Sequence, residues 1–374
     1  MLIHSSNRNH QGDACRRRNA GRAPASSPLD QDARPGRFPG PLPGVPLTLS
    51  ALPEGFALGA YRIVRQISRG GFSIVYLAQD ANGNSVAIKE YLPCALADRQ
   101  PGELVPRVRP QSTRVYAHGL RSFFEEGRVL ATIAHRNIMR VTDFFRANET
   151  VYLVMQYESG RSLQEHVLEN RSAAADGPVL AEAFIRRTFS ELLSGLREVH
   201  SNRLLHLDIK PANIFLRMNG EPILLDFGAA RETLQRDPAG VQPMYTPGYA
   251  APELYRRDAE FGPWTDVYAV GATLYACMTA QPPQEAERRM ADDHMPARLR
   301  ALGRHYSPAL VALVERCLQL DALARPQSVL AVQRVLRDDP RVPVPSRWEQ
   351  AAARVASMRG RIARYLLERD ITWY

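Results

Sequence analysis

Short runs rich in residues that favour β-strands occupy the first part of the chain after residue 60. One run between them has helical spacing instead. The predicted strands are 61–67, 74–78, 86–89, 141–145 and 151–157, and the predicted helix is 122–133. This part of the chain therefore predicts a small β-rich unit with one main helix.

The periodicity becomes helical after Ser162. Apolar residues three or four positions apart form one face, which predicts an amphipathic helix packed on a core. That face consists of Ile185, Phe189, Leu192, Leu193, Leu196 and Val199. Two short β runs follow at 214–216 and 223–225, and helices continue to about Arg337. The whole pattern predicts an α+β protein with a small β-rich lobe and a larger, mostly helical lobe.

The first residues differ from this body in composition. Residues 1–55 are rich in Pro, Gly, Arg and Ser, and cannot bury enough apolar surface to offset the entropy of ordering. We therefore expect a disordered leader. The folded domain is expected over 56–338, with lobes of about 56–157 and 158–338.

The last residues, 339–374, predict a basic amphipathic helix. An apolar stripe recurs at spacings of three and four, and residues 341–374 carry seven Arg against three acidic residues. The stripe consists of Trp348, Ala351, Val355, Met358, Ile362 and Tyr365. Three interpretations stay open: it docks on the large lobe, joins a second protein, or lies on an anionic membrane.

Composition excludes several classes of protein. With 374 residues, 45% of them apolar and 23% charged, the chain is not collagen-like, a disulfide scaffold or wholly disordered. The longest charge-free, mostly apolar run, 267–280, is shorter than the ~20 residues of a membrane-spanning helix. Cys15, Cys94, Cys277 and Cys317 form no CxxC pair, which favours a reducing compartment. We expect a cytoplasmic protein without a transmembrane segment.

The basic residues are unevenly distributed between the two residue types. The net charge of +9 could indicate nucleic acid or another anionic partner. However, 46 of the 48 basic residues are Arg, and the only lysines are Lys89 and Lys210. A compact ammonium cannot be replaced by a planar guanidinium where geometry matters. One interpretation is therefore that both lysines take part in the chemistry of the protein. The other is that the two lysines were retained by chance.

Four motifs occur in order around the two lysines: VAIK at 86–89, HLDIKPAN at 206–213, DFG at 226–228 and APE at 251–253. With them the chain resembles the eukaryotic-like serine/threonine protein kinases, and bacterial members in particular, over about 61–337. The resemblance implies the two-lobed protein-kinase fold. It also implies transfer of the γ-phosphoryl group of ATP to protein hydroxyls, autophosphorylation included. The implied cofactors are ATP and Mg²⁺, or Mn²⁺, and the implied partners are protein substrates and a cognate phosphatase, without nucleic acid.

The resemblance assigns roles to the charged residues. Lys89 would hold the α- and β-phosphates and pair with Glu126 of the main helix, with Glu125 as the alternative partner. Asp208 would orient the substrate hydroxyl and accept its proton, and Lys210 would neutralise the γ-phosphate. Asn213 and Asp226 would bind magnesium. The implied nucleotide contacts are Ser68, Gly70, Gly71, Ser73, Val75, Ala87, Lys89, Glu126, Met155, Gln156 and Glu158.

Three features of the sequence depart from the family pattern. Ser68 and Ser73 replace two glycines of the phosphate-covering loop, and serine is stiffer than glycine. Leu207 replaces the usual Arg before the catalytic Asp, so the pocket that receives an activation-loop phosphate lacks one cation. Residues 93–118 form an insertion, either a docking surface or a tolerated loop.

Further residues are assigned by the same resemblance. The KP pair at 210–211 and Thr246 match the serine/threonine pattern, in which the threonine contacts Asp208 and Lys210. Asp266 would hold the backbone of the catalytic loop, and Glu253 and Arg325 would form an ion pair in the large lobe.

Two other functions compete with catalysis. A pseudokinase, which would act as a nucleotide-binding scaffold, is supported only by Ser68, Ser73 and Leu207. A small-molecule phosphotransferase shares the HxDxxxxN core but should lack the APE segment at 251–253.

Overall fold

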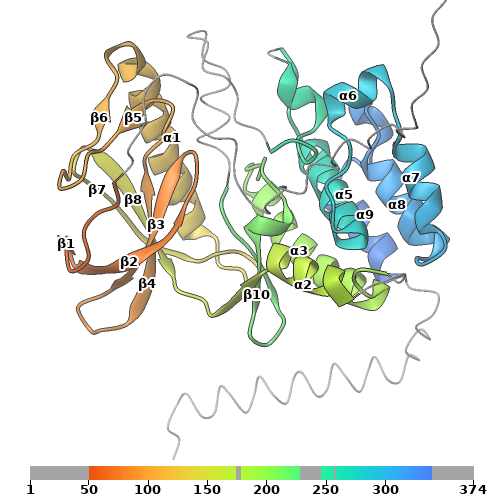
Figure 1. Cartoon of the computed structure of the whole chain (residues 1–374), viewed down its shortest axis with the longest axis horizontal. Coiled ribbons are helices and arrows are strands. Elements are labelled where there is room, and N and C mark those ends of the chain that lie inside the picture. The colour runs from red at the N-terminus through yellow and green to blue at the C-terminus, as the bar shows by residue number, and fades with distance from the viewer. Residues whose placement is uncertain (1–49, 174–177, 228–245, 257, 339–374) are drawn as a thin grey trace, which may run out of the picture. The chain divides into compact units, whose positions relative to one another are not determined.

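The computed structural model of the chain describes residues 50–173, 178–227, 246–256 and 258–338 (Figure 1). Most of the expected leader and the expected C-terminal helix lie outside these ranges. The described residues form an antiparallel sheet with one long helix, followed by a mostly helical part, as expected from the sequence.

Six antiparallel strands form the N-terminal sheet in the order β1-β2-β3-β4-β8-β7. Their bounds are β1 Ala57–Leu58, β2 Tyr61–Arg69, β3 Ser73–Gln79, β4 Ser85–Tyr91, β7 Val141–Ala147 and β8 Thr150–Gln156. All five predicted strands are present, and β1 was not predicted. Successive side chains of β4 face opposite sides of the sheet, so Ile88 lies in the N-terminal core while Ala87 lies in the core shared with the helical part.

The long helix of the N-terminal lobe is α1, Thr113–Thr132. The prediction that it begins at Ser122 is wrong, because its first turns carry the buried residues Val115 and Tyr116. Its buried face also includes Gly119 and Gly127, which a search for apolar periodicity overlooks. A Cβ on Gly127 would lie 2.2 Å from Leu153 Cδ2, so this glycine lets α1 approach β8 closely.

The expected insertion is structured. It contains β5 Ala97–Asp98, β6 Arg107–Val108 and the 3₁₀ helix η1 Pro110–Ser112, and it leads directly into α1. Leu96, Ala97 and Arg99 are each at most 1% exposed. Residues 93–112, called the β5–β6 segment below, are therefore partly core and not only an exposed loop.

The fold already includes part of the expected leader. Leu52 is 3% exposed, and its backbone N–H donates to the Tyr76 hydroxyl at 3.1 Å. The neighbouring Ser50 exchanges backbone and side-chain hydrogen bonds with Arg99. Residues 50–55 are thus packed on the sheet, where the buried Leu52 and backbone hydrogen bonds hold them.

The C-terminal part contains a three-stranded sheet in the order β11-β10-β9 and is otherwise mostly helical, with two helices between β9 and β10 in the chain. The strands are β9 Gly160–Ser162, β10 Ile214–Arg217 and β11 Pro222–Leu224. The helices are α2 Leu163–Ala173, α3 Glu182–Ser201, α5 Pro263–Thr279, α6 Ala286–Ala291, α7 Met295–Leu302, α8 Pro308–Cys317 and α9 Val329–Arg337. Short 3₁₀ helices are η2 Pro211–Asn213, η3 Pro252–Tyr255 and η4 Ala322–Ala324.

The core of this part is organised around α3 and α5. The six predicted apolar residues of α3 are all completely buried, which confirms that face. Helix α5 is buried along most of its length. Within the described ranges, no helix combines the length and the apolar character needed to cross a membrane.

Candidate active site

The loop between α3 and β10 carries the HLDIKPAN motif, and a buried aspartate of α5 holds its backbone. Asp266 accepts hydrogen bonds at 2.8 Å from the backbone N–H groups of His206 and Leu207, and it contacts His200 Nε2 at the same distance. The expected role of Asp266 is therefore confirmed. Burial would raise the pKa of this carboxyl, but the hydrogen bond and charge of His200 lower it overall. Asp266 thus stays ionised and keeps accepting from the loop.

His206 fixes the other side of the same loop. Its Nε2 lies 2.7 Å from the carbonyl oxygen of Leu225, and its ring lies 4.7 Å from that of Phe227. Complete burial lowers the pKa of His206, so the imidazole is neutral and Nε2 donates to the carbonyl. The loop that carries Asp208 is thereby tied to the segment that carries Asp226.

Three side chains meet at the carboxylate of Asp208. Lys210 Nζ lies 2.9 Å from Asp208 Oδ2 and 3.2 Å from Oδ1. Asn213 Nδ2 donates to Asp208 Oδ2 at 2.7 Å and to the Asp208 backbone carbonyl at 2.8 Å. The Thr246 hydroxyl donates to Asp208 Oδ1 at 3.2 Å and accepts from Lys210 Nζ at 2.8 Å. The predicted contacts of Thr246 are therefore confirmed.

Lys89 reaches Asp226 from the N-terminal sheet. Its Nζ forms an ion pair with Asp226 Oδ1 at 3.0 Å, and it lies 5.6 Å from the centre of the Phe123 ring on α1. Glu126 follows Phe123 by one helical turn on the buried face of α1 and is 4% exposed. The structure thus pairs the strand lysine with the aspartate of the DFG motif, and the pairing of Lys89 with Glu126 stays a prediction.

Glu125, the alternative partner for Lys89, faces away from the sheet. Its side chain is 58% exposed and pairs with Arg128 Nε at 2.7 Å on the surface of α1. Glu125 is therefore not placed to pair with Lys89, whereas Glu126, the next residue, lies on the buried face of α1.

Asn213 and Asp226 offer oxygen atoms of the kind that magnesium prefers. Both hydrogens of the Asn213 amide nitrogen have acceptors on Asp208, which leaves the amide Oδ1 to face a ligand. Asp226 is partly exposed, at 40% of its side chain. Among the described residues, no group of three or more His, Cys, Asp or Glu could hold a metal alone. A magnesium ion here would take its remaining ligands from phosphate and water.

The expected nucleotide contacts on the sheet share one face. Val75 pairs with Lys89 across β3 and β4, and Ala87 pairs with Met155 across β4 and β8. All three apolar side chains contact the core shared with the helical part. The backbone N–H of Gln156 donates to the Arg140 carbonyl at 3.0 Å, so this N–H already has an acceptor within the protein.

The glycine-rich turn connects β2 and β3 beside this face. Ser68 and Ser73 lie in those two strands, and Gly70 N–H donates to the Ser73 carbonyl at 2.9 Å. A Cβ added to Gly70 would have no atom closer than 3.9 Å. There is therefore room for a side chain even at Gly70.

Comparison with known proteins decides the family. The protein kinase domain matches residues 61–337, which is most of the chain. The chain belongs to the protein kinase family.

Its relatives include bacterial serine/threonine kinases. The chain is 28% identical over 267 residues to a protein named serine/threonine-protein kinase PknA from Nostoc sp., covering 69% of this chain and 43% of PknA. It is 30% identical over 288 residues to inactive serine/threonine-protein kinase PLK5 of Mus musculus, covering 75% of this chain and 42% of PLK5. The chain thus spans less than half the length of these relatives.

A solved structure of the apo form of PpkA-294 is also similar. It has 34% sequence identity and a TM-score of 0.67, and the match covers 76% of this chain and 99% of that chain. The kinase fold expected from the sequence is therefore confirmed.

The side chain of Glu158 has a contact that the motifs do not reveal. Both of its carboxylate oxygens accept from Arg217 of β10, from Nε at 3.0 Å and from Nη2 at 2.8 Å. Arg217 also donates to the backbone carbonyl of Arg136, so one guanidinium ties the connection between the kinase lobes to the segment before β7. Arg217 was missed because it is one of many arginines in the chain, and it marks no motif.

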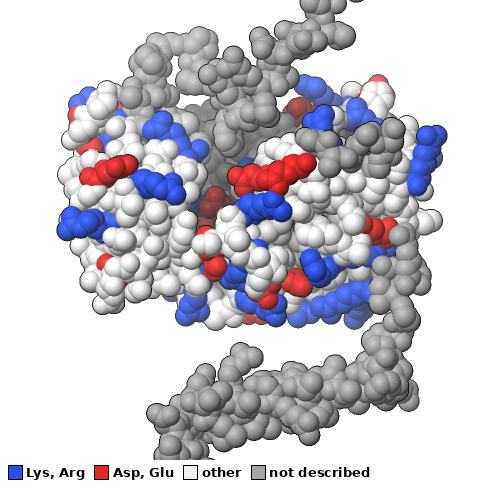
Figure 2. Space-filling view, turned by 60° about the horizontal axis from the view of Figure 1, so that its bottom comes forward, with Lys and Arg blue, Asp and Glu red and all other residues white. Residues whose placement is uncertain are grey.

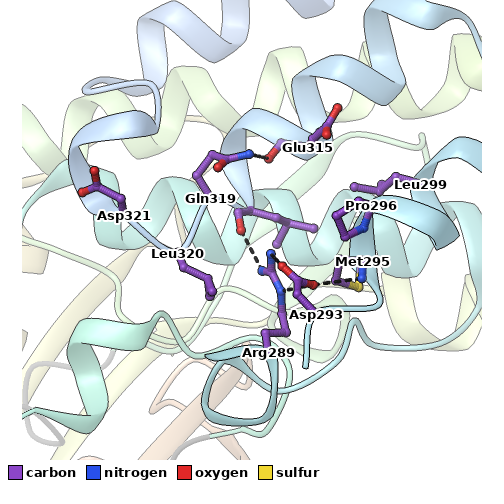
Figure 3. Close-up of a pocket in the computed structure, with 10 residues that line it drawn as sticks. Arg289, Asp293, Met295, Pro296, Leu299, Glu315, Gln319, Leu320 and Asp321 are labelled. Atoms are coloured by element: carbon purple, nitrogen blue, oxygen red, sulfur yellow. Dashed lines mark hydrogen bonds and ion pairs between the residues drawn. The ribbon is translucent and has the colours of Figure 1, made fainter. Parts of the chain in front are cut away.

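A separate cavity of about 180 Å³ lies between α6, α7 and α8 of the kinase domain (Figure 3). Figure 3 shows Arg289 beside Asp293 in this cavity, and both ends of that ion pair are satisfied. Arg289 Nε and Nη2 bond the two carboxylate oxygens at 3.0 and 2.9 Å, and Nη1 donates to the Leu318 carbonyl at 2.7 Å. The cavity contains none of the expected kinase residues, and we assign no ligand to it.

The charge of the kinase domain is mixed on the face that Figure 2 shows, where basic and acidic side chains are interspersed over both lobes. The net charge of +9 therefore does not form a single basic field on this face.

Proposed function

We propose that the chain is a protein serine/threonine kinase of the cytoplasm that transfers the γ-phosphoryl group of ATP to protein hydroxyls, its own included. The catalytic domain would span 56–338, with residues 50–55 packed on it. The observation that carries the proposal is the convergence of Lys210, Asn213 and Thr246 on the carboxylate of Asp208. A scaffold that only binds nucleotide would not need this arrangement.

Each side chain has one task in the proposed reaction. Asp208 accepts a hydrogen bond from the substrate hydroxyl and takes its proton as the oxygen attacks the γ-phosphorus. The bond between the γ-phosphorus and the β–γ bridging oxygen breaks, and ADP leaves. Lys210 offsets the negative charge of the transferred group, and Lys89 binds the α- and β-phosphates. Magnesium held by Asn213 and Asp226 would neutralise phosphate charge when bound.

Serine/threonine specificity is supported by the position of Thr246. Its hydroxyl bridges Asp208 and Lys210, beside the place where a short substrate side chain would enter. PknA carries serine/threonine kinase in its name, and for this chain that specificity is part of the proposal.

The alternative is a pseudokinase that binds nucleotide as a scaffold. Ser68, Ser73 and Leu207 favour it, and one relative is named an inactive kinase. Against it stands the charged set, since Lys89, Glu126, Asp208, Asn213 and Asp226 are all retained.

The proposal is tested by incubating the purified chain with γ-labelled ATP, Mg²⁺ and generic acceptor proteins, followed by phosphoamino-acid analysis. We expect label on serine or threonine of the acceptors and of the chain itself. ATP binding without any transfer would favour the scaffold, and label only on tyrosine would refute the stated specificity.

Regulation is expected to differ from that of kinases that need a phosphorylated activation loop. Leu207 lies with φ at 61°, its side chain packs against the apolar core, and it brings no cation next to Asp208. We therefore expect phosphatase-treated protein to phosphorylate acceptors without a lag, measured as initial rate. Thr246 and Thr233, which lies outside the described residues, are the sites to monitor. A long lag that ends as one of them becomes modified would contradict this prediction.

A further inference from the structure

A fully buried ion pair connects β4 with the β5–β6 segment. Glu90 and Arg99 are both 0% exposed, and Arg99 Nη1 and Nη2 bond the two Glu90 oxygens at 2.6 and 2.7 Å. The hydroxyls of Tyr76 and Tyr152 donate to the same carboxylate at 2.7 and 2.8 Å. Glu90 thus accepts four hydrogen bonds, which is the compensation a buried charge requires.

All five N–H groups of Arg99 have acceptors. Besides Glu90, they donate to the Ser50 carbonyl at 2.8 Å, the Tyr76 hydroxyl at 3.0 Å and the Leu104 carbonyl at 3.3 Å. Burial and the charge of Glu90 raise the pKa of Tyr76, so its hydroxyl stays protonated and can donate. One side chain therefore fixes the segment before the sheet, the sheet itself and the turn of the β5–β6 segment.

The same strand carries Lys89 on its other face. Because side chains alternate along β4, Glu90 points into the N-terminal core while Lys89 points toward Asp226. A displacement of the backbone at Glu90 would move Lys89 with it.

The glycine-rich turn is bonded to the chain as it leaves β4. Leu92 N–H donates to the Phe72 carbonyl, and Cys94 N–H donates to the Gly71 carbonyl, both at 2.9 Å. These two bonds restrain the backbone that would cover the phosphates. Their donors are the residue just before the β5–β6 segment and the second residue of that segment, and both precede the part that Arg99 anchors.

Helix α1 packs against the end of β4, close to the β5–β6 segment. Figure 1 shows β5 and β6 beside α1 at one end of the N-terminal sheet. The ring of Tyr91, which follows Glu90, lies 5.3 Å from that of Tyr116 and 5.4 Å from that of Phe123 on α1. Phe123 in turn lies under Lys89 and one turn before Glu126. The segment, the turn and the helix thus form one packed unit around β4.

We propose that Glu90 and Arg99 are positioning residues for the nucleotide site, because their buried pair anchors the β5–β6 segment that restrains the glycine-rich turn and α1. This ion pair fixes the position of the phosphate-covering backbone and of Glu126 relative to Lys89. No phosphate on the activation loop is needed to hold them there. The same ion pair also compensates for Leu207, since α1 is fixed from within its own lobe. The inference rests on the proposed kinase function, and it describes how the ATP site of that kinase is held in place.

The test measures the dissociation constant of Mg²⁺-ADP by calorimetry, together with the thermal unfolding midpoint, for three variants of the full chain. Arg99→Lys keeps the charge but loses part of the five-donor fork. The double variant Glu90→Met/Arg99→Met removes both charges, which a core often tolerates. The hydroxyl oxygens of Tyr76 and Tyr152 still accept there from Leu52 N–H and Asn148 Nδ2, while their own O–H groups lose the Glu90 acceptor. The control is Arg107→Lys, whose side chain is 63% exposed in β6 and pairs only with Glu103.

We expect the dissociation constant to rise about tenfold in Arg99→Lys and in the double variant, because a site that loses its preorganisation binds its ligand more weakly. Arg107→Lys should match the wild type. An unchanged dissociation constant in either variant that keeps the wild-type unfolding midpoint would overturn the proposal. ADP binding does not require phosphoryl transfer. A wild-type protein that binds ADP but phosphorylates nothing would therefore refute the proposed function, and the binding test of Glu90 and Arg99 could still be interpreted.

Discussion

Replacing Asp208 by Asn is expected to reduce phosphoryl transfer by about 10²–10⁴-fold, the range that a positioned general base contributes. Asn cannot accept the substrate proton, but it has nearly the same shape. It also retains an oxygen for Lys210 and Thr246, which contact Asp208 at 2.9–3.2 Å. The fold should therefore survive. Transfer is measured with γ-labelled ATP, and folding is measured by the thermal unfolding midpoint.

Replacing Lys89 by Arg should have a comparable effect through the nucleotide. A guanidinium is wider than an ammonium, and Lys89 is enclosed by Asp226 at 3.0 Å and the Phe123 ring at 5.6 Å. We expect a loss of about 10²–10³-fold, as when one preorganised donor is removed from a transition state. Arg128→Lys on the exposed face of α1 is the matched control and should be neutral. Autophosphorylation of Lys89→Arg at a near wild-type rate would refute the role of this lysine.

The motifs predicted the parts of the site whose chemistry is local to a few neighbouring residues. Asp208, Lys210 and Asn213 lie within one short loop, so their spacing alone places their side chains together. Thr246 and Asp266 lie far along the chain, and their contacts with that loop followed only from the resemblance to kinases. The structure gives both contacts directly.

The anchor around Glu90 could not be predicted in the same way. Arg99 is one of 46 arginines, and nothing near it distinguishes a buried guanidinium from an exposed one. Its burial depends on Tyr76 and Tyr152 lying on the strands on either side of β4 with their hydroxyls aimed at the Glu90 carboxylate, which is a property of the folded sheet. The early start of α1 was missed for a related reason, because glycines on its buried face carry no hydrophobic signal.

A large effect on stability is expected at the buried ion pair of Glu253 and Arg325 in the large lobe. Arg325 is 2% exposed, and both oxygens of Glu253 accept from its Nη1 and Nη2 at 2.7 and 2.9 Å, which confirms the predicted ion pair. The remaining N–H groups donate to the carbonyls of Gln319, Leu320 and Trp264. All five donors of Arg325 are thus satisfied, and its guanidinium also lies 5.0 Å from the Tyr268 ring.

Replacing Glu253 by Gln should lower the free energy of unfolding by about 3–5 kcal/mol, because it leaves the buried guanidinium without a counter-charge. For a domain of this size, the unfolding midpoint should fall by roughly 6–10 °C, measured by calorimetry. Arg325→Lys should be similarly damaging, since an ammonium cannot reach three carbonyls and both carboxylate oxygens together.

The matched control is Glu285→Gln, which breaks an ion pair with Arg288 on the surface of the same lobe, where the arginine side chain is 74% exposed. Exposed pairs contribute about 0–1 kcal/mol, so its midpoint should hardly change. Because Glu253 follows Thr246 by seven residues, the buried pair also holds the segment whose hydroxyl contacts Asp208. Transfer activity of Glu253→Gln should therefore fall together with the folded fraction as temperature rises. Equal midpoints for Glu253→Gln and Glu285→Gln would show that the buried pair does not stabilise the large lobe.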